Sequence, residues 1–431
     1  MDANNLKTMK RILILTAAAL TLCACFRSQA QTCSSSAPVV KPGIEVLRDR
    51  GFAGLEGKRV GLLTNPSGVD RQLRSTIDIL KENVNLVALY APEHGVRGDI
   101  WAGGKVESGK DDSTGLPVFS LYGASRQATP EMLKGIDVMV YDIQDVGSRS
   151  YTFISCLGLT MRACAELGIE VMVLDRPNPL GGLKVEGCLV RDGFYSYVSQ
   201  YRIPYVYGLT VGEVATLINE EGLNRGQKGD AEPLKCKLTV IPMEGWTRDM
   251  TYERTGLPWV MPSPNIPYAR NAICYPCSGL VGEFNDYLNI GIGYTIPFDA
   301  FAAEWIDADA LKARLDSYKV PGVAWRTVHY TPFYGSSAKK LLHGVQYYFT
   351  DYEAAPLTLV QFYVMQAVYE LYKKNPFEMS PGRINMFNKV CGTDFVSTEF
   401  GKRFQVSDIV DFWTADVEDF KALSKKYYIY R

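Results

Sequence analysis

The amino-acid sequence predicts an α/β protein with a mostly parallel sheet, followed by a second domain of α+β type. Three observations support the prediction. Short runs of Val, Leu, Ile and Met recur between residues 59 and 178 and are nearly continuous in apolar residues, as is typical of strands buried on both faces. From about residue 187 prolines and aromatic residues become frequent and the alternation loses its regularity. A chain of 431 residues is also too long for one small core.

Five strands are expected in the first domain, at residues 59–65, 86–93, 118–123, 137–145 and 170–178. Helical segments are expected between them, at 73–81, 130–133 and 153–167. Strands that alternate with helices form a parallel, Rossmann-like sheet. The turn after the first strand reads NPSG rather than GxGxxG, so we expect no dinucleotide site and no cofactor.

Beyond this domain, helices are expected at 211–219, at 359–373 and in part of 406–423, and a strand at 345–350. The predicted organisation therefore has three parts. A signal and linker segment occupies residues 1–36, the Rossmann-like domain residues 44–186, and the second α+β domain residues 187–431.

The N-terminal segment has the pattern of a secretion signal. Basic residues at positions 7, 10 and 11 precede an apolar run at 12–20 that is too short to span a membrane. Two cleavage modes stay open. The stretch LCAC at 22–25 resembles a lipobox, which would place a lipid on Cys25, whereas SQA at 28–30 suits ordinary signal peptidase. We expect secretion across the inner membrane to the periplasm or, as a lipoprotein, to the outer membrane.

Composition narrows the possible partners. The formal net charge of −1 provides no basic surface for nucleic acid. The ten cysteines are scattered and form no dense disulfide framework; the CYPC stretch at 274–277 is interpreted as structural. The three histidines, at 94, 329 and 343, lack the short spacings of metal ligands, so no metal site is expected.

Polar residues gather where the expected strands end. In an open parallel sheet, ligands bind beyond the carboxyl ends of the strands, so these side chains are predicted to converge on one crevice. Some of them also suit helix caps and turns. The predicted ligand-binding residues of this domain are Asn65, Arg97, Asp99, Gln144, Asp145, Arg149, Tyr151, Arg176 and Asn178.

Glu93 and His94 are the least turn-like of these strand-end residues, and Gly95 after them allows an unusual backbone. No GxSxG serine elbow is present. A carboxylate beside an imidazole favours acid–base chemistry, because burial raises a Glu pKa and lets it donate a proton to a leaving oxygen. Hydrolysis of a glycosidic bond needs such an acid, and also a group that activates water or a participating substrate amide. We predict Glu93, His94 and Asp142 to be catalytic, with Asp142 or Asp145 positioning water or an acetamido group.

Long motifs around these residues resemble the NamZ-type family of exo-β-N-acetylmuramidases. They are PEHGVRGD at 92–99, TGLPVFSLYG at 114–123, GIDVMVYDIQDVGSRSYTFI at 135–154, LDRPNPLGG at 174–182 and WVMPSPNIP at 259–267. The resemblance implies a cleft between two domains and release of N-acetylmuramic acid from the non-reducing end of peptidoglycan fragments. It also implies that Glu93 is the catalytic acid or base.

One segment departs from the family pattern. Where members carry a stretch like EGTNxSxGRGT, residues 281–298 read VGEFNDYLNIGIGYTIPF. Glu283 and Asn285 are still expected to bind substrate, but the Arg expected near Ile292 is missing. Either the sugar is modified, or another Arg such as Arg149 or Arg270 binds the lactyl carboxylate of muramic acid.

Three hypotheses about the function stay open. The first is the exo-acting glycosidase, whose retaining or inverting course the sequence does not decide. The second is a sugar- or muropeptide-binding lipoprotein without turnover, which the altered segment motivates. The third, an esterase or amidase on the same polymer, is disfavoured because serine-elbow and zinc-ligand patterns are missing.

Overall fold

The first sheet has seven strands in the order β3-β4-β2-β1-β5-β6-β7. In the computed structural model, residues 39–101, 104, 106–123, 126–223, 233–284 and 286–431 are described. All strand pairs in this sheet are parallel except that between β3 and β4. The strands are β1 (Arg59–Thr64), β2 (Asn85–Ala91), β3 (Gly109–Lys110), β4 (Pro117–Ser120), β5 (Val138–Asp142), β6 (Glu170–Leu174) and β7 (Leu238–Ile241). The predicted fold class is confirmed.

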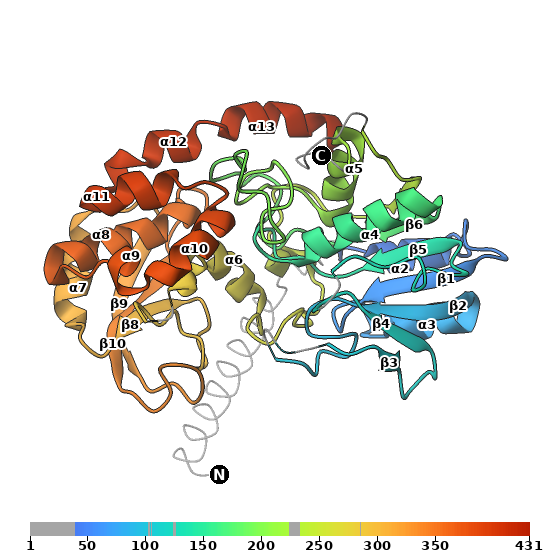
Figure 1. Ribbon diagram of the computed structural model, residues 1–431, viewed down its shortest axis with the longest axis horizontal. Helices are drawn as coiled ribbons and strands as arrows, with labels where there is room; N and C mark the ends of the chain where they lie inside the picture. Colours follow the sequence, from blue (N-terminus) through green and yellow to red (C-terminus); the bar gives the residue numbers. More distant parts are fainter. Residues whose placement is uncertain (1–38, 102–103, 105, 124–125, 224–232, 285) are drawn as a thin grey trace, which may run out of the picture. The chain divides into compact units, whose positions relative to one another are not determined.

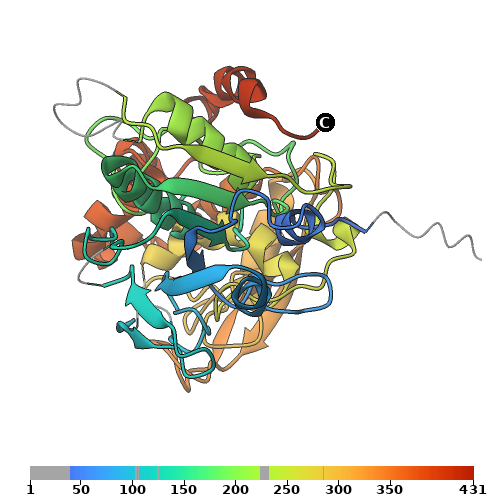
Figure 2. The same cartoon turned by 90° about the vertical axis from the view of Figure 1, so that its right-hand side faces the viewer.

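Both faces of this sheet are covered, which explains the continuous apolar runs. Alternate residues of β5 enter different cores: Met139 and Tyr141 pack with α4 (Phe153–Leu167) and α5 (Val211–Glu221), whereas Val138 and Val140 pack with α2 (Gly43–Asp49) and α3 (Thr76–Asn83). Figure 2 shows the two helix pairs on opposite sides of the strands. Such strands need apolar residues at every position rather than at alternate ones.

One expected helix of the first domain is not formed, α2 and β3 were not expected, and the first sheet extends past the predicted domain boundary. Residues 130–133 form turns rather than a helix. Strand β7 follows the predicted boundary between residues 186 and 187, yet it pairs with β6 and belongs to the first sheet. Position 187 therefore does not separate the two sheets. The prolines and aromatic residues that suggested a boundary there belong to the long connection between β6 and α5.

The second sheet is antiparallel, with the order β8-β10-β9. Its strands are β8 (Ala300–Ala303), β9 (Val323–Tyr330) and β10 (Leu342–Phe349). Helices pack with this sheet in one large core that also takes in residues of the first domain, such as Val146 and Tyr205. Figure 1 shows these elements in yellow to red. The helices in this core are α6 (Ala269–Ser278), α7 (Ala308–Ser317), α8 (Val360–Tyr372), α9 (Pro376–Met379), α10 (Ile384–Cys391) and α12 (Val410–Thr414). The short α11 (Gly401–Arg403) buries no residue, and α13 (Val417–Ser424) packs through Phe420 in the core that holds α4 and α5.

No helix in the described part of the chain combines the length and the apolar character needed to cross a membrane. The seven described cysteines are buried and unpaired. Both cysteines of the CYPC stretch lie in α6. The proposed signal segment and Cys25 fall outside the described residues.

The C-terminal segment returns to the first sheet, where it lies beside α5 (Figure 1). The Tyr430 hydroxyl donates a hydrogen bond to Asp175 Oδ2 at 2.6 Å, directly after β6, and accepts one from the Met243 amide at 2.8 Å, after β7. Burial raises the pKa of Asp175 to about 7, and the bond from Tyr430 opposes that rise.

Replacing Tyr430 by Phe should therefore destabilise the protein more at high pH than at low pH. The folded-state pKa of Asp175 lies above its ordinary value of 3.8, so its contribution to stability is largest below that value and is lost as the pH rises through about 7. Without Tyr430 the folded pKa rises further, which penalises the ionised form. Urea unfolding at about pH 5 and about pH 8 measures the difference, with Tyr428→Phe as the control. An equal loss at both pH values would contradict this account.

Candidate active site

Glu93 lies in a tight turn directly after β2. The turn is closed by a hydrogen bond from the Gly95 amide to the Pro92 carbonyl at 3.1 Å. His94 adopts a φ of +75° and Gly95 a φ of +81°. A positive φ is unfavourable for a non-glycine residue, and such strain is concentrated at functional sites. The structure thus supports the prediction that this turn is more than a connection.

The His94 ring holds the loop that follows. Its Nδ1 lies 3.0 Å from the Ile100 carbonyl oxygen, and the ring is buried. A carbonyl can only accept, so Nδ1 carries the proton, and in the neutral ring Nε2 is an acceptor. His94 therefore fixes the shape of residues 94–100 and presents one acceptor nitrogen.

The Glu93 carboxylate is half-buried and accepts a hydrogen bond from the Thr152 hydroxyl at 2.9 Å. Tyr122 follows β4, which pairs with β2 so that Ser120 lies opposite Ala91, and burial together with the Glu93 charge raises the pKa of Tyr122 to about 12. Thr152 is the residue before α4, so the start of that helix brings it to the end of β2. The Thr152 hydroxyl thus orients the carboxylate.

Further aromatic residues connect Glu93 to the second domain. The rings of Tyr151 and Tyr275 meet edge to face at 5.1 Å, and the Tyr275 hydroxyl lies 3.0 Å from Ser150 Oγ. Burial raises the pKa of Tyr275, and the charges of Glu283 and Glu93 raise it further. Tyr275 therefore lies within electrostatic reach of a carboxylate from each domain.

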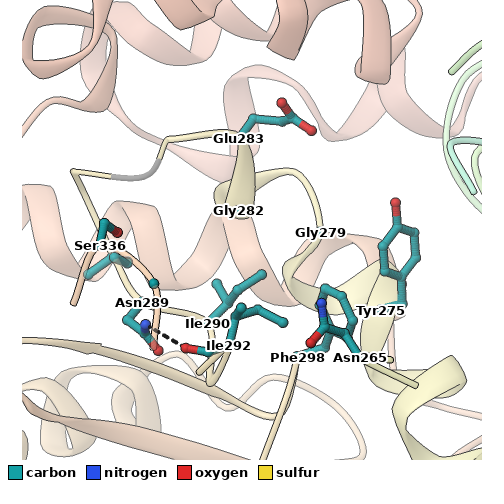
Figure 3. Close-up of a pocket in the computed structure, with 12 residues that line it drawn as sticks. Asn265, Tyr275, Gly279, Gly282, Glu283, Asn289, Ile290, Ile292, Phe298 and Ser336 are labelled. Atoms are coloured by element: carbon teal, nitrogen blue, oxygen red, sulfur yellow. Dashed lines mark hydrogen bonds between the residues drawn. The ribbon is translucent and has the colours of Figure 1, made fainter. Parts of the chain in front are cut away.

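Tyr275 also lines a cavity of about 370 Å³ within the second domain, together with Glu283 and Asn265. Figure 3 shows the Glu283 carboxylate and the Tyr275 hydroxyl above an apolar floor that includes Ile290. Glu283 pairs with Arg383 at 2.7 Å, and burial raises the pKa of Glu283. The altered segment 281–298 thus lines a cavity beside the Glu93 site. Asn285 lies outside the described residues.

Asp142 does not have the predicted catalytic geometry. It is fully buried at the end of β5, and its two carboxylate oxygens accept hydrogen bonds from Arg176 and Thr76. The Arg176 Nη2 atom lies 2.9 Å from Asp142 Oδ2, and the same nitrogen donates to the Val69 carbonyl. Asp142 and Arg176 form a buried ion pair that holds the strand ends together, with no face left for a substrate.

Asn65, Gln144 and Asn178 are also structural. Each is buried and donates its side-chain amide to a backbone carbonyl of another loop, at 2.7–2.9 Å. Asn65 and Asn178 in addition accept a bond from the amide two residues on. These amides build the strand-end loops rather than line a crevice.

Arg149, predicted to bind substrate, is almost completely buried. Its guanidinium donates to the carbonyls of Cys188 and Ile203 at 2.8 and 2.7 Å, and to that of Cys391, in α10, at 2.6 Å. Arg270 pairs with Asp299 at 2.8 Å. The structure therefore assigns both arginines that were expected to replace the missing family Arg to structural contacts.

Arg97 and Asp99 line a different cavity, of about 610 Å³, beside the edge of the first sheet. Arg97 pairs there with Asp111 at 2.8 Å. The cavity that contains Tyr275 is lined by other residues. Arg97 and Asp99 therefore do not line the cavity that contains Tyr275.

Asp145 is a buried carboxylate close to the Glu93 site. It accepts hydrogen bonds from the Gly147 amide at 2.8 Å and from the Tyr207 hydroxyl. Burial raises the pKa of Asp145 to about 6, and its Oδ1 atom has no hydrogen-bond partner within the described structure. The charges of Asp145 and Glu93 both raise the pKa of Tyr151, which burial raises most, so both carboxylates lie within electrostatic reach of Tyr151.

The sequence analysis did not single out Tyr122, Thr152 or Tyr275. The sequence could have indicated Thr152, since this residue stands just before an expected helix near the strand ends. Tyr275 could not have been identified in this way, because it is more than 100 positions from the turn that holds Glu93. Among the residues that the structure describes, no group of three or more His, Cys, Asp and Glu side chains could hold a metal ion.

Comparison with known proteins agrees with this geometry. Residues 60–270 match the family model described as exo-beta-N-acetylmuramidase NamZ, N-terminal, and residues 273–430 match its C-terminal counterpart. The chain belongs to the NamZ family. The resemblance found in the motifs is therefore confirmed. The two NamZ models meet between residues 270 and 273, within α6 and after β7.

Relatives cover nearly the whole chain. The peptidoglycan beta-N-acetylmuramidase NamZ of Bacillus subtilis (strain 168) is 40% identical over 395 residues, which are 91% of this chain and 92% of that protein. Two crystal structures of DUF1343 family proteins from Bacteroides fragilis NCTC 9343 each cover 91% of this chain, with 99% of their own length matched. They have TM-scores of 0.85 and 0.72 at 51% and 28% identity.

Proposed function

We propose that this chain is an exo-acting glycoside hydrolase that releases N-acetylmuramic acid from the non-reducing end of peptidoglycan fragments. The main support for this function is the 40% identity, over 91% of the chain, to a peptidoglycan beta-N-acetylmuramidase. The turn that holds Glu93 supplies the acid such a reaction needs.

In the proposed mechanism Glu93 protonates the oxygen of the leaving sugar. Thr152 holds its carboxylate, so little reorganisation is needed when the substrate arrives. His94 Nε2 serves in this proposal as a fixed acceptor for a substrate hydroxyl. These groups act on the sugar whose bond is broken.

The second role, positioning water or the 2-acetamido group, falls to Asp145 rather than to Asp142. Both oxygens of Asp142 are engaged by Arg176 and Thr76, whereas Asp145 keeps one oxygen without a partner in the described structure. With a pKa of about 6, Asp145 can hold or release a proton near neutral pH.

The proposed function is tested with 4-nitrophenyl glycosides. We expect the wild-type protein to release 4-nitrophenol from the β-N-acetylmuramic acid glycoside and to leave the β-N-acetylglucosamine glycoside largely intact. The readout is absorbance of the released phenol. A folded wild type that binds the muramic sugar but turns over neither glycoside would favour the binding-protein alternative.

We further propose that the chain is exported and tethered by a lipid on Cys25. The basic and apolar pattern at residues 7–20 and the LCAC stretch support this proposal. Fractionation of cells that express the full chain or its Cys25→Ala variant tests it. Loss of the membrane-bound fraction in the variant alone is the expected result, and equal fractionation of both would point to cleavage after Ala30.

A further inference from the structure

Arg126 lies on the loop that follows β4, four residues after Tyr122. Its side chain is exposed, and its guanidinium carbon lies 4.4 Å from the centre of the Tyr197 ring. Stacking of this kind fixes the plane of an Arg side chain without using its hydrogen-bond donors. The guanidinium is thus held in place with its donors still available.

Arg126 and Glu93 flank the same two aromatic rings. Glu93 and Tyr122 follow the paired strands β2 and β4, and the charges of Glu93 and Arg126 both act on Tyr122. Burial and the Glu93 charge raise the pKa of Tyr197, and the Arg126 charge opposes that rise. A ligand in contact with Glu93 therefore lies close to a stacked, exposed cation.

The other arginines near the strand ends and the cavity have partners. Arg97, Arg176 and Arg383 each pair with a carboxylate, and Arg149 donates to backbone carbonyls. For Arg126 the contact found in the described part of the chain is the ring face of Tyr197. Of these arginines, Arg126 is the one whose guanidinium N–H donors can still bind an anion.

N-acetylmuramic acid differs from N-acetylglucosamine by a lactyl ether that ends in a carboxylate. A guanidinium binds a carboxylate through two parallel hydrogen bonds. We propose that Arg126 binds this lactyl carboxylate and thereby selects muramic acid at the Glu93 site. This inference rests on the proposed function and names the residue that determines its specificity.

The charges around the site support this assignment. Asp145 is a buried carboxylate near the Glu93 site, so an anionic substrate needs a cation to offset its repulsion. When the lactyl group is joined to a peptide, its carboxylate becomes a neutral amide. Arg126 therefore favours ends of the glycan whose lactyl group is free.

The test compares wild type with Arg126→Gln on two 4-nitrophenyl muramic glycosides, one with the free lactyl carboxylate and one with its neutral lactamide. We expect wild type to prefer the carboxylate in kcat/KM by about 10- to 100-fold, the range of a charge-assisted contact. The variant should lose that preference, mainly through a higher KM for the carboxylate, while the lactamide is little affected. Arg126→Lys should recover part of it.

Arg162→Gln serves as the matched control. It removes the same charge from α4, where Arg162 pairs with Glu166 on the helix surface, and should leave the preference unchanged. A preference that survives in Arg126→Gln, or equal losses on both glycosides, would overturn the proposal.

A second measurement keeps this inference separate from the proposed reaction. Titration calorimetry with free N-acetylmuramic acid and N-acetylglucosamine reports binding without turnover. We expect wild type to bind the muramic sugar more tightly and Arg126→Gln to bind both alike. If neither glycoside is hydrolysed, the proposed function fails, and this comparison alone decides the role of Arg126: equal affinity of wild type and variant for the muramic sugar would refute it.

Discussion

Glu93→Gln should lower kcat/KM on a muramic acid–glucosamine disaccharide by about 10²- to 10⁴-fold, the usual contribution of a general acid. The sugar alcohol cannot leave without a proton, and the Gln amide cannot supply one. The fold should be retained, because the Gln carbonyl can still accept the hydrogen bond that Thr152 donates to Glu93.

The same variant should lose much less activity on the 4-nitrophenyl glycoside, since 4-nitrophenolate leaves without protonation. Parallel assays of the two substrates therefore separate an acid from a base or a positioning group. Glu131→Gln, an exposed change in a turn of the first domain, is the control and should match wild type. Equal losses on both substrates would argue against Glu93 as the acid.

Arg176→Met should destabilise the protein by about 3–5 kcal/mol, the cost of leaving a buried charge without its partner. The side chains of Arg176 and Asp142 are only 5% and 1% exposed, so water cannot replace the lost ion pair. Urea unfolding near neutral pH measures the change. The double variant with Asp142→Asn should recover part of the loss, because no charge is then stranded.

Arg59 and Asp137 provide the contrast. They form an ion pair at the opposite end of β1 and β5, with side chains 54% and 39% exposed. Solvent and salt screen such a pair, so Arg59→Met should change the free energy of unfolding little. If the two Arg→Met variants were equally stable, burial would not be what makes the Asp142 pair important.

The fold class could be predicted from the sequence because a strand buried on both faces has apolar residues at nearly every position. The strands β1, β2, β5 and β6 lie within the expected ranges to about one residue. Helix α4 spans residues 153–167 as expected. Glu93 was also readable, since a Glu-His pair is an unusual way to end a strand.

For most polar residues at the strand ends, the sequence could not distinguish a ligand-binding role from a structural one. Asp142, Asn178 and Arg149 look like ligand-binding residues in the sequence. In the structure each is buried, and its polar atoms are engaged in hydrogen bonds with neighbouring segments. A polar side chain at such a position meets either a ligand or the backbone. The sequence does not record which, because the partners of these side chains are mostly residues distant in the chain.

The sequence by itself determined the parallel sheet, the family and the turn that holds Glu93, since these depend on local pattern and contiguous motifs. Only the tertiary structure decided which charged groups are available for chemistry. It paired Asp142 with Arg176, brought Tyr275 to Tyr151 and left Arg126 stacked on Tyr197. The physical reason is that burial and pairing set whether a charge can act, and both arise from contacts between distant segments.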